Sequence, residues 1–320
     1  MQKPFRRLLL TLALAGLSCA ASAQSGKPLT LVVPFSPGGG SDTSARLLSQ
    51  ALGTHLGQTV VIENKPGAAG VIGAEQVARA QPDGNTVLLG NIGTQSINPI
   101  LYKKLPYDAK TAFVPISLIA ELPQVLLVHP GVQAQNVPGL IALLKAQPGK
   151  LSYSTSGAGS SMHLAAEMFK IATQTEVQHV PYRGGGPAIA DLLAGHVQIS
   201  FATVLESMGH IKSGKLRALA VTGDKRVPAL PNVPTVAETV PGFKSISWVG
   251  VLAPAKTPQA TIDRLAAAIR DTVAQPEIAH KLNEQGAVAK TTTPAQFATL
   301  IQADHDTYAR LIAEKGITAE

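Results

Sequence analysis

The segment LTLVVPFSPGGGSD, residues 29–42, joins an apolar and β-branched run to three consecutive glycines and the start of a helical pattern. The run over 29–35 has the composition of a buried strand. Over residues 42–56 the apolar positions fall on one helical face: Ala45, Leu48, Leu52 and Leu56. The segment therefore predicts a strand that passes through a glycine-rich turn into a helix facing the core.

The same alternation of short strands and helices continues along most of the chain. Strands are predicted over 29–35, 60–63, 86–89, 125–129, 151–154, 177–180, 197–201 and 216–221, and helices over 42–56, 161–171, 260–274 and 294–313. This order predicts βαβ units and an α/β fold with mainly parallel sheets. With 320 residues, 45% of them hydrophobic, the chain is long enough for two domains. Pro130-Gly131 and the Pro/Gly-rich stretch 227–243 break the rhythm and are expected near crossings or loops between the domains.

The N-terminus has the pattern of a secretory signal peptide. Basic residues at positions 3, 6 and 7 precede an apolar run over 8–17 and a small-residue triplet that ends at Ala23. The run of about ten residues is shorter than the roughly 20 needed to cross a bilayer. We expect cleavage near Ala23 and a periplasmic protein, with lipidation of Cys19 as the alternative. Because Cys19 is the only cysteine, cleavage leaves no disulfide, thiol nucleophile or Cys-based zinc site.

The charge balance is mildly basic. The chain carries 27 Lys and Arg against 20 Asp and Glu, and loss of the three N-terminal basic residues lowers the net charge from +7 to +4. No run of basic residues interleaved with aromatics is present, so we expect no nucleic-acid partner. A surplus of this size suits either a solvated basic surface or attraction of anions.

Three glycine-rich junctions, at 36–42, 156–161 and 183–187, each open a predicted helix. Glycine allows a backbone to approach a ligand closely, and the first turn of a helix offers unpaired N–H groups to anions. The alternative is that these glycines only form tight turns. Three such junctions in one chain favour an anion-binding site at the carboxyl edge of the sheets.

The junctions do not match nucleotide-binding motifs, so no cofactor is expected. Met162 stands where a dinucleotide fingerprint requires its third glycine. The segment 209–215 fits the start of a Walker A loop, but Leu216 stands where Ser or Thr must hold magnesium.

The best enzyme alternative is a serine hydrolase that uses Ser160 or Ser161 with His163. Two or three residues of separation at a helix start are explained more simply by a helix cap, and no Gly-x-Ser-x-Gly elbow surrounds either serine. The eight histidines form no metal-binding motif, so no metal site and no catalytic residue are predicted. Trp248 and Tyr182 are pocket walls or core residues, and the sequence favours the core.

Several segments together resemble a known family. They are 34–42 (PFSPGGGSD), 61–70 (VIENKPGAAG), 82–86 (PDGNT), 98–102, 159–165, 180–184 (VPYRG), 214–221 (GKLRALAV), and Trp248 followed by Ala253-Pro254. The set is similar to the Bug, or TctC-type, substrate-binding proteins of tripartite tricarboxylate transporters, and the likeness covers most of the mature chain.

The resemblance implies a two-domain type II periplasmic-binding-protein fold, or Venus flytrap. Residues 24–124 would form the first part of domain 1, 125–221 would form domain 2, and 222–320 would return to domain 1 with the C-terminal helices. It further implies a monomer that holds a small organic carboxylate through backbone amides and ordered waters, and passes it to the membrane subunits of a tripartite tricarboxylate-type transporter. Presentation of the ligand to a sensor kinase is the alternative.

The resemblance also implies two clamps on the ligand. The clamp of domain 1 maps onto Phe35, Ser36, Gly38, Gly39, Gly40, Ser41 and Asp42, with Thr94 nearby; the clamp of domain 2 maps onto Ser156, Gly157, Ser160 and His163, with Tyr182 and Gly184 nearby. The charge of Asp42 would oppose an anion unless it caps the helix or meets an amino group of the ligand.

Two departures from the family pattern bear on ligand choice. Many relatives have an aromatic after the tryptophan and an aspartate at the end of the strand before residue 203, where this chain has Val249 and Ala202-Thr203. Dicarboxylates, amino-acid-like acids, aromatic acids and citrate all suit a clamp of this kind, and the sequence leaves them open.

Overall fold

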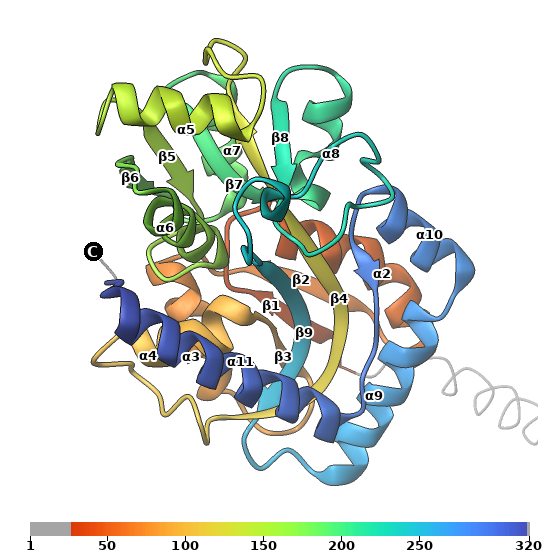
Figure 1. Cartoon of the computed structure of the whole chain (residues 1–320). Helices are drawn as coiled ribbons and strands as arrows, with labels where there is room; N and C mark the ends of the chain where they lie inside the picture. The colour runs from red at the N-terminus through yellow and green to blue at the C-terminus, as the bar shows by residue number, and fades with distance from the viewer. Residues whose placement is uncertain (1–26, 319–320) are drawn as a thin grey trace, which may run out of the picture.

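The computed structural model describes residues 27–318, so the predicted signal peptide, its cleavage site and Cys19 lie outside the described residues. The described chain forms two α/β halves joined by a shared sheet (Figure 1). The strand order is β2-β1-β3-β9-β4-β7-β5-β6, with β8 and β10 paired to β4 off this path. The halves therefore meet along one central strand, β4 (Phe113–Val128).

The first half contains both chain ends of the described region. Its strands are β1 (Leu29–Val33), β2 (Val60–Asn64), β3 (Thr86–Asn91), β9 (Ile246–Pro254) and β10 (Val288–Ala289). The β1–β2 and β1–β3 pairs are parallel, whereas β9 runs antiparallel to both β3 and β4. Helices α2 (Gly40–Leu56), α9 (Gln259–Val273) and α10 (Pro276–Glu284) pack on one face, and α3 (Val71–Ala78) and α11 (Pro294–Lys315) on the other.

Alternation along β1 explains this layering. Leu31 and Val33 pack with α2 and α9, while Val32 between them packs with α3 and α11. All three side chains are buried, as expected of a strand covered on both faces. The core-facing stripe predicted for α2 is confirmed, because Ala45, Leu48 and Leu52 are buried in the first of these layers.

The second half is coloured mainly green in Figure 1. Its strands are β5 (Ser152–Thr155), β6 (Gln178–Pro181), β7 (Ile199–Thr203) and β8 (Arg217–Val221). Helices α5 (Val137–Ala146) and α6 (Ser161–Thr173) pack on one face, and α7 (Gly185–Leu193) and α8 (Val204–Lys212) on the other. β5 is parallel to β6 and β7, whereas β7 and β8 run antiparallel to β4.

The polypeptide crosses between the halves at a buried polar cluster of Gln124, Thr222 and Ser245. The Thr222 N–H donates to the Gln124 carbonyl at 2.9 Å, and the Ser245 hydroxyl donates to Gln124 Oε1 at 2.9 Å. β4 pairs with β9 up to Pro123 and with β7 from Gln124 onward, so it changes partner at this cluster. The domain limits expected at 124 and 221 stay a prediction.

Three short helical segments lie in the loops of the first half and one near the crossing: η2 (Ala68–Gly70), the π-helix η3 (Gly93–Ile97), α4 (Asn98–Leu101) and η4 (Val236–Glu238). Among the described helices, none has the length and apolar character needed to cross a bilayer.

Candidate functional site

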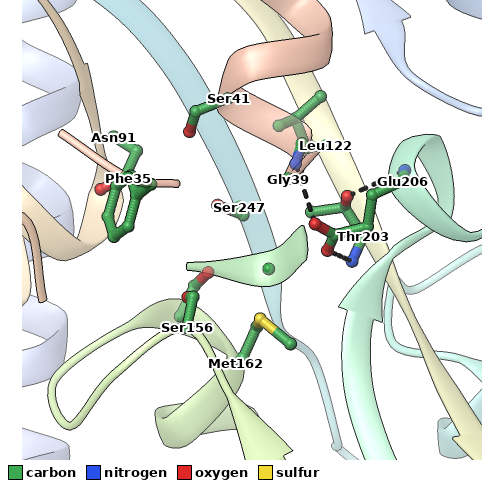
Figure 2. A pocket seen from close by; sticks show the side chains of 13 residues that line it. Phe35, Gly39, Ser41, Asn91, Leu122, Ser156, Met162, Thr203, Glu206 and Ser247 are labelled. Carbon is green, nitrogen blue, oxygen red and sulfur yellow. Dashed lines mark hydrogen bonds between the residues drawn. The ribbon is translucent and has the colours of Figure 1, made fainter. Parts of the chain in front are cut away.

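A small pocket lies between the two halves, where the carboxyl ends of the parallel strands and the starts of α2, α6 and α7 converge (Figure 2). Its cavity has a volume of about 30 Å³. The lining residues are Phe35, Gly39, Gly40, Ser41, Asn91, Leu122, Ser156, Ser161, Met162, Gly185, Thr203, Glu206 and Ser247. Both halves contribute to the wall, so the pocket exists only where they come together.

Asp42 holds the loop before α2 in place. Its carboxylate accepts hydrogen bonds from the Gly38 N–H at 3.0 Å, Arg46 Nε at 2.9 Å and Asn64 Nδ2 at 3.0 Å. Burial alone would raise the pKa of Asp42, but the bonds from Arg46, Gly38 and Asn64 outweigh burial and hold the pKa below its ordinary value. The charge of Asp42 is therefore satisfied inside its own half.

The glycine loops of the two halves touch beside the pocket. The Ser36 N–H donates to the Arg183 carbonyl at 3.1 Å, and the Ser36 hydroxyl donates to the same carbonyl at 3.0 Å. A Cβ placed on Gly184 would lie 2.7 Å from the Ser36 nitrogen, and φ of Gly184 is +154°. Only glycine fits this contact, because both the space and the backbone angle exclude a side chain.

Glu206 forms a second link between the halves. Its Oε2 accepts from the Gly40 N–H at 2.8 Å, and its Oε1 accepts from the Thr203 N–H at 2.7 Å (Figure 2). Thr203 accepts from the Glu206 N–H in return, which completes a capping box at the start of α8. Burial raises the pKa of Glu206, although the N–H groups of Thr203 and Gly40 act to lower it.

Asn91 faces the pocket from the end of β3, held by Thr94. The Thr94 N–H donates to Asn91 Oδ1 at 2.9 Å, and the Asn91 N–H donates to Thr94 Oγ1 at 3.0 Å. Because Oδ1 is occupied, the Asn91 amide has its Nδ2 donor left for the pocket. Thr94 is fully buried and outside the lining, so it positions the Asn91 side chain and does not itself face the pocket.

The start of α6 is built around Ser160 and His163. Ser160 Oγ accepts from the His163 N–H at 3.3 Å, and His163 Nδ1 accepts from the Gly159 N–H at 3.3 Å. The His163 ring stacks on His179 at 4.4 Å, and burial followed by the charge of His179 lowers its pKa to about 4. Ser160 thus caps the helix, and its hydroxyl bonds to the backbone of His163 rather than to the ring that a hydrolase would use as base.

The predicted site residues fall into three groups. Phe35, Gly39, Gly40, Ser41 and Ser156 line the pocket; Ser36 and Gly184 join the halves beside it; Gly38, Asp42, Thr94, Gly157, Ser160, His163 and Tyr182 lie outside the lining. Gly157 donates its N–H to Thr155 Oγ1 at 3.2 Å, and the Tyr182 hydroxyl donates to Asp191 Oδ2 at 2.6 Å. Trp248 is buried against Phe297 and donates to Asp304, so it belongs to the core, as the sequence favoured.

Sequence reasoning did not select several lining residues: Asn91, Leu122, Ser161, Met162, Gly185, Thr203, Glu206 and Ser247. Asn91 and Thr203 end strands β3 and β7, so the rule that ligands gather at carboxyl strand ends could have found them. Leu122 and Ser247 lie within the antiparallel pair β4 and β9, where no sequence signal indicates a site. Within residues 27–318, no group of three or more His, Cys, Asp or Glu could hold a metal ion.

Comparison with known proteins relates this geometry to a family. The family model of the tripartite tricarboxylate transporter family receptor, TctC, matches residues 44–317. A UPF0065 protein from the tcbD-tcbE intergenic region of a Pseudomonas species is 37% identical, covering 98% of this chain and 95% of that protein. Protein BugT of Bordetella pertussis is 34% identical, covering 95% of each chain.

Solved structures agree in fold over nearly the whole chain. An R. palustris protein with adipate has a TM-score of 0.89 and 35% identity, covering 91% of this chain and 98% of that one. MatC from Rhodopseudomonas palustris with bound malate has a TM-score of 0.86 and 30% identity, covering 89% and 98%. These similarities confirm the expected two-domain α/β fold of a periplasmic binding protein. The chain therefore belongs to the tripartite tricarboxylate transporter receptor family, the TctC or Bug family of solute-binding proteins.

Proposed function

We propose that this protein captures a small organic carboxylate in the pocket between its halves and delivers it, in the periplasm, to the membrane subunits of a tripartite tricarboxylate-type transporter. It acts as a receptor and catalyses no reaction. The delivery step and the removal of the first 23 residues rest on family membership and the N-terminal pattern.

The pocket itself carries the proposal. Backbone N–H groups at the start of α6, the Asn91 amide and the hydroxyls of Ser41, Ser156 and Ser247 surround it. Neither the Ser41 nor the Ser247 hydroxyl bonds to any other described residue, although both residues are more than nine-tenths buried. Hydrogen bonds to a charged group contribute about 1.5–3 kcal/mol each, so a few such donors suffice for a carboxylate. The bound adipate and malate of two relatives support this ligand class.

A thermal-shift screen of organic acids against the purified, ligand-free protein tests the proposal. A true ligand at about 100 times its Kd should stabilise the fold by about 2.7 kcal/mol and raise the Tm by several degrees. Its methyl ester should give no shift, because the ester lacks the charge that the donors recognise. If no carboxylate shifts the Tm and an ester is instead hydrolysed in a Ser160-dependent manner, the receptor assignment fails.

A further inference from the structure

The pocket that we propose for a carboxylate contains a carboxylate of its own. Among the residues that line it, Glu206 is the one ionisable side chain, and no Lys, Arg or His contributes to the wall. A second carboxylate in the pocket would therefore meet the carboxyl oxygens of Glu206, which already accept from the Gly40 and Thr203 N–H groups, with no basic side chain beside them. This step rests on the proposed function. If the pocket binds a carboxylate, Glu206 determines which carboxylates it accepts.

Glu206 and Asp42 each occupy one backbone donor on the α2 side. Gly40 is the first residue of α2, and its N–H already donates to Glu206 Oε2 across the pocket. The Gly38 N–H before it donates to Asp42. Two amides that could hold a ligand anion at this helix start are thus bonded to carboxylates of the protein itself.

The donors on the α6 side remain open. Ser161 and Met162 form the first turn of α6, where backbone N–H groups have no partner within the helix, and both residues line the pocket. Asn91 Nδ2 and the Ser156 hydroxyl also line the pocket, and neither bonds to another described residue. The α6 side therefore offers open donors to an anion, whereas the carboxyl oxygens of Glu206 lie near the start of α2.

We propose that Glu206 orients and selects the ligand. The single carboxylate of the ligand binds at the start of α6, and the group that faces Glu206 is an uncharged or cationic hydrogen-bond donor, such as a hydroxyl, an amide or an ammonium group. A dicarboxylate of the same length is disfavoured, because its second carboxylate would face Glu206 without a donor between them.

Calorimetric titration with two series of matched acids tests this selection. The six-carbon series is adipate, its monoamide, 6-hydroxyhexanoate and 6-aminohexanoate; the four-carbon series is succinate, its monoamide, 4-hydroxybutanoate and 4-aminobutanoate. In the series that fits the pocket, the wild-type protein should bind at least one donor-bearing acid about tenfold or more tightly than the dicarboxylate. The Glu206→Gln variant should reduce that ratio by a similar factor.

Two further variants separate charge from local structure. Glu206→Asp keeps the carboxyl group while shortening the side chain, so it should still disfavour the dicarboxylate. Glu238→Gln is a matched control, because Glu238 makes the same capping box with Thr235 at η4 but lies outside the pocket lining. The control should leave the ratio unchanged.

The outcomes separate the selection by Glu206 from the proposed function. If the dicarboxylate binds the wild-type protein as tightly as its monoamide, hydroxy and amino partners, the selection by Glu206 is overturned even if Glu206→Gln fails to fold. An unchanged ratio in a folded Glu206→Gln variant overturns it as well. If no acid of any kind binds, the proposed function fails rather than this inference alone.

Discussion

Gly39 and Gly185 meet across the pocket because neither has a side chain. A Cβ on Gly39 would lie 3.2 Å from the Gly185 nitrogen and 3.4 Å from Glu206 Oε2. The backbone of Gly39 has a φ of −81°, which any residue adopts, so glycine is required here for the contact and not for the turn. The contact belongs to the closed arrangement of the two halves.

A methyl group at position 39 should therefore act as a wedge that holds the two halves apart. We expect Gly39→Ala to weaken ligand binding about tenfold, because overpacking a tight contact costs about 1–3 kcal/mol. Gly209→Ala is the matched control, since a Cβ on Gly209 in α8 would have nothing within 4 Å; this change should add up to about 1 kcal/mol of helix stability without affecting binding. Calorimetric titration and urea unfolding measure the two effects, and equal binding by Gly39→Ala and wild type would contradict the wedge.

At the scale of the element, α6 supports the pocket through a buried polar stack beneath its first turn. His163 lies between the Gly159 N–H and the ring of His179, and Tyr153 stacks on the other side of His179 at 4.9 Å. The Tyr153 hydroxyl donates to Glu167, which also accepts from Lys170. The glycine loop before α6 thus rests on a neutral histidine.

This neutral histidine predicts a loss of stability in acid. The folded pKa of His163 is about 4, below its ordinary value of 6.5, so the unfolded chain binds a proton in this range that the folded chain does not. The contribution of His163 is intact above about pH 6.5 and declines toward pH 4, reaching a loss of about 2–3 kcal/mol near pH 4.5. His163→Asn keeps an acceptor for Gly159 but cannot titrate, so urea unfolding at neutral and acidic pH should show a shallower loss for the variant. Parallel losses would refute this role of His163.

The elements also differ in how readily the sequence reveals them. β1, α2 and α6 follow from periodicity and glycine junctions, because each is local and covered on its apolar face. The strand expected over 125–129 is only the end of β4, whose earlier part contains Pro115, Glu121 and Pro123 and has no regular alternation. β9 was not predicted, because its interior Gly250 weakens the strand signal although a Cβ there would strike Phe297.

The same limit applies to the site. The Thr203 and Glu206 spacing indicates a capping box, but no local pattern reveals that the carboxylate also reaches the start of α2, 166 residues away. The glycine junctions could be predicted because they are properties of the backbone. The carboxyl group of Glu206 inside the pocket could not, because its place depends on how the two halves meet.

For the whole molecule, the structure is a closed one. The halves are joined by Ser36 to Arg183, by Gly40 to Glu206, and by the Tyr102 hydroxyl to the Ala158 carbonyl at 2.8 Å. A cavity of about 30 Å³ has room for only one or two water molecules. A ligand the size of a dicarboxylate therefore needs these contacts to separate for entry, and the halves must then close around it with a larger cavity than this one.

Binding should therefore show a rate limit set by opening. With rising ligand concentration, the observed rate of ligand binding should approach a plateau rather than increase linearly. Trp248 is the only tryptophan and lies next to Ser247 of the pocket, so stopped-flow tryptophan fluorescence can follow the event. Gly39→Ala should raise the plateau, because its wedge favours the open form. A linear dependence up to high concentration in both proteins would show that opening is not limiting.

The central position of β4 also affects how the protein unfolds. This single strand is the central partner for β9 in one half and for β7 and β8 in the other. If one half loses its sheet, a strand edge of the other half becomes exposed. The two halves should therefore unfold as one cooperative unit. The calorimetric and van't Hoff enthalpies of unfolding should then be equal. A receptor built on separate sheets could melt half by half, and a bound solute would then protect only the half that melts first. In this protein, a bound solute should instead stabilise the whole chain, and the single unfolding transition should show it.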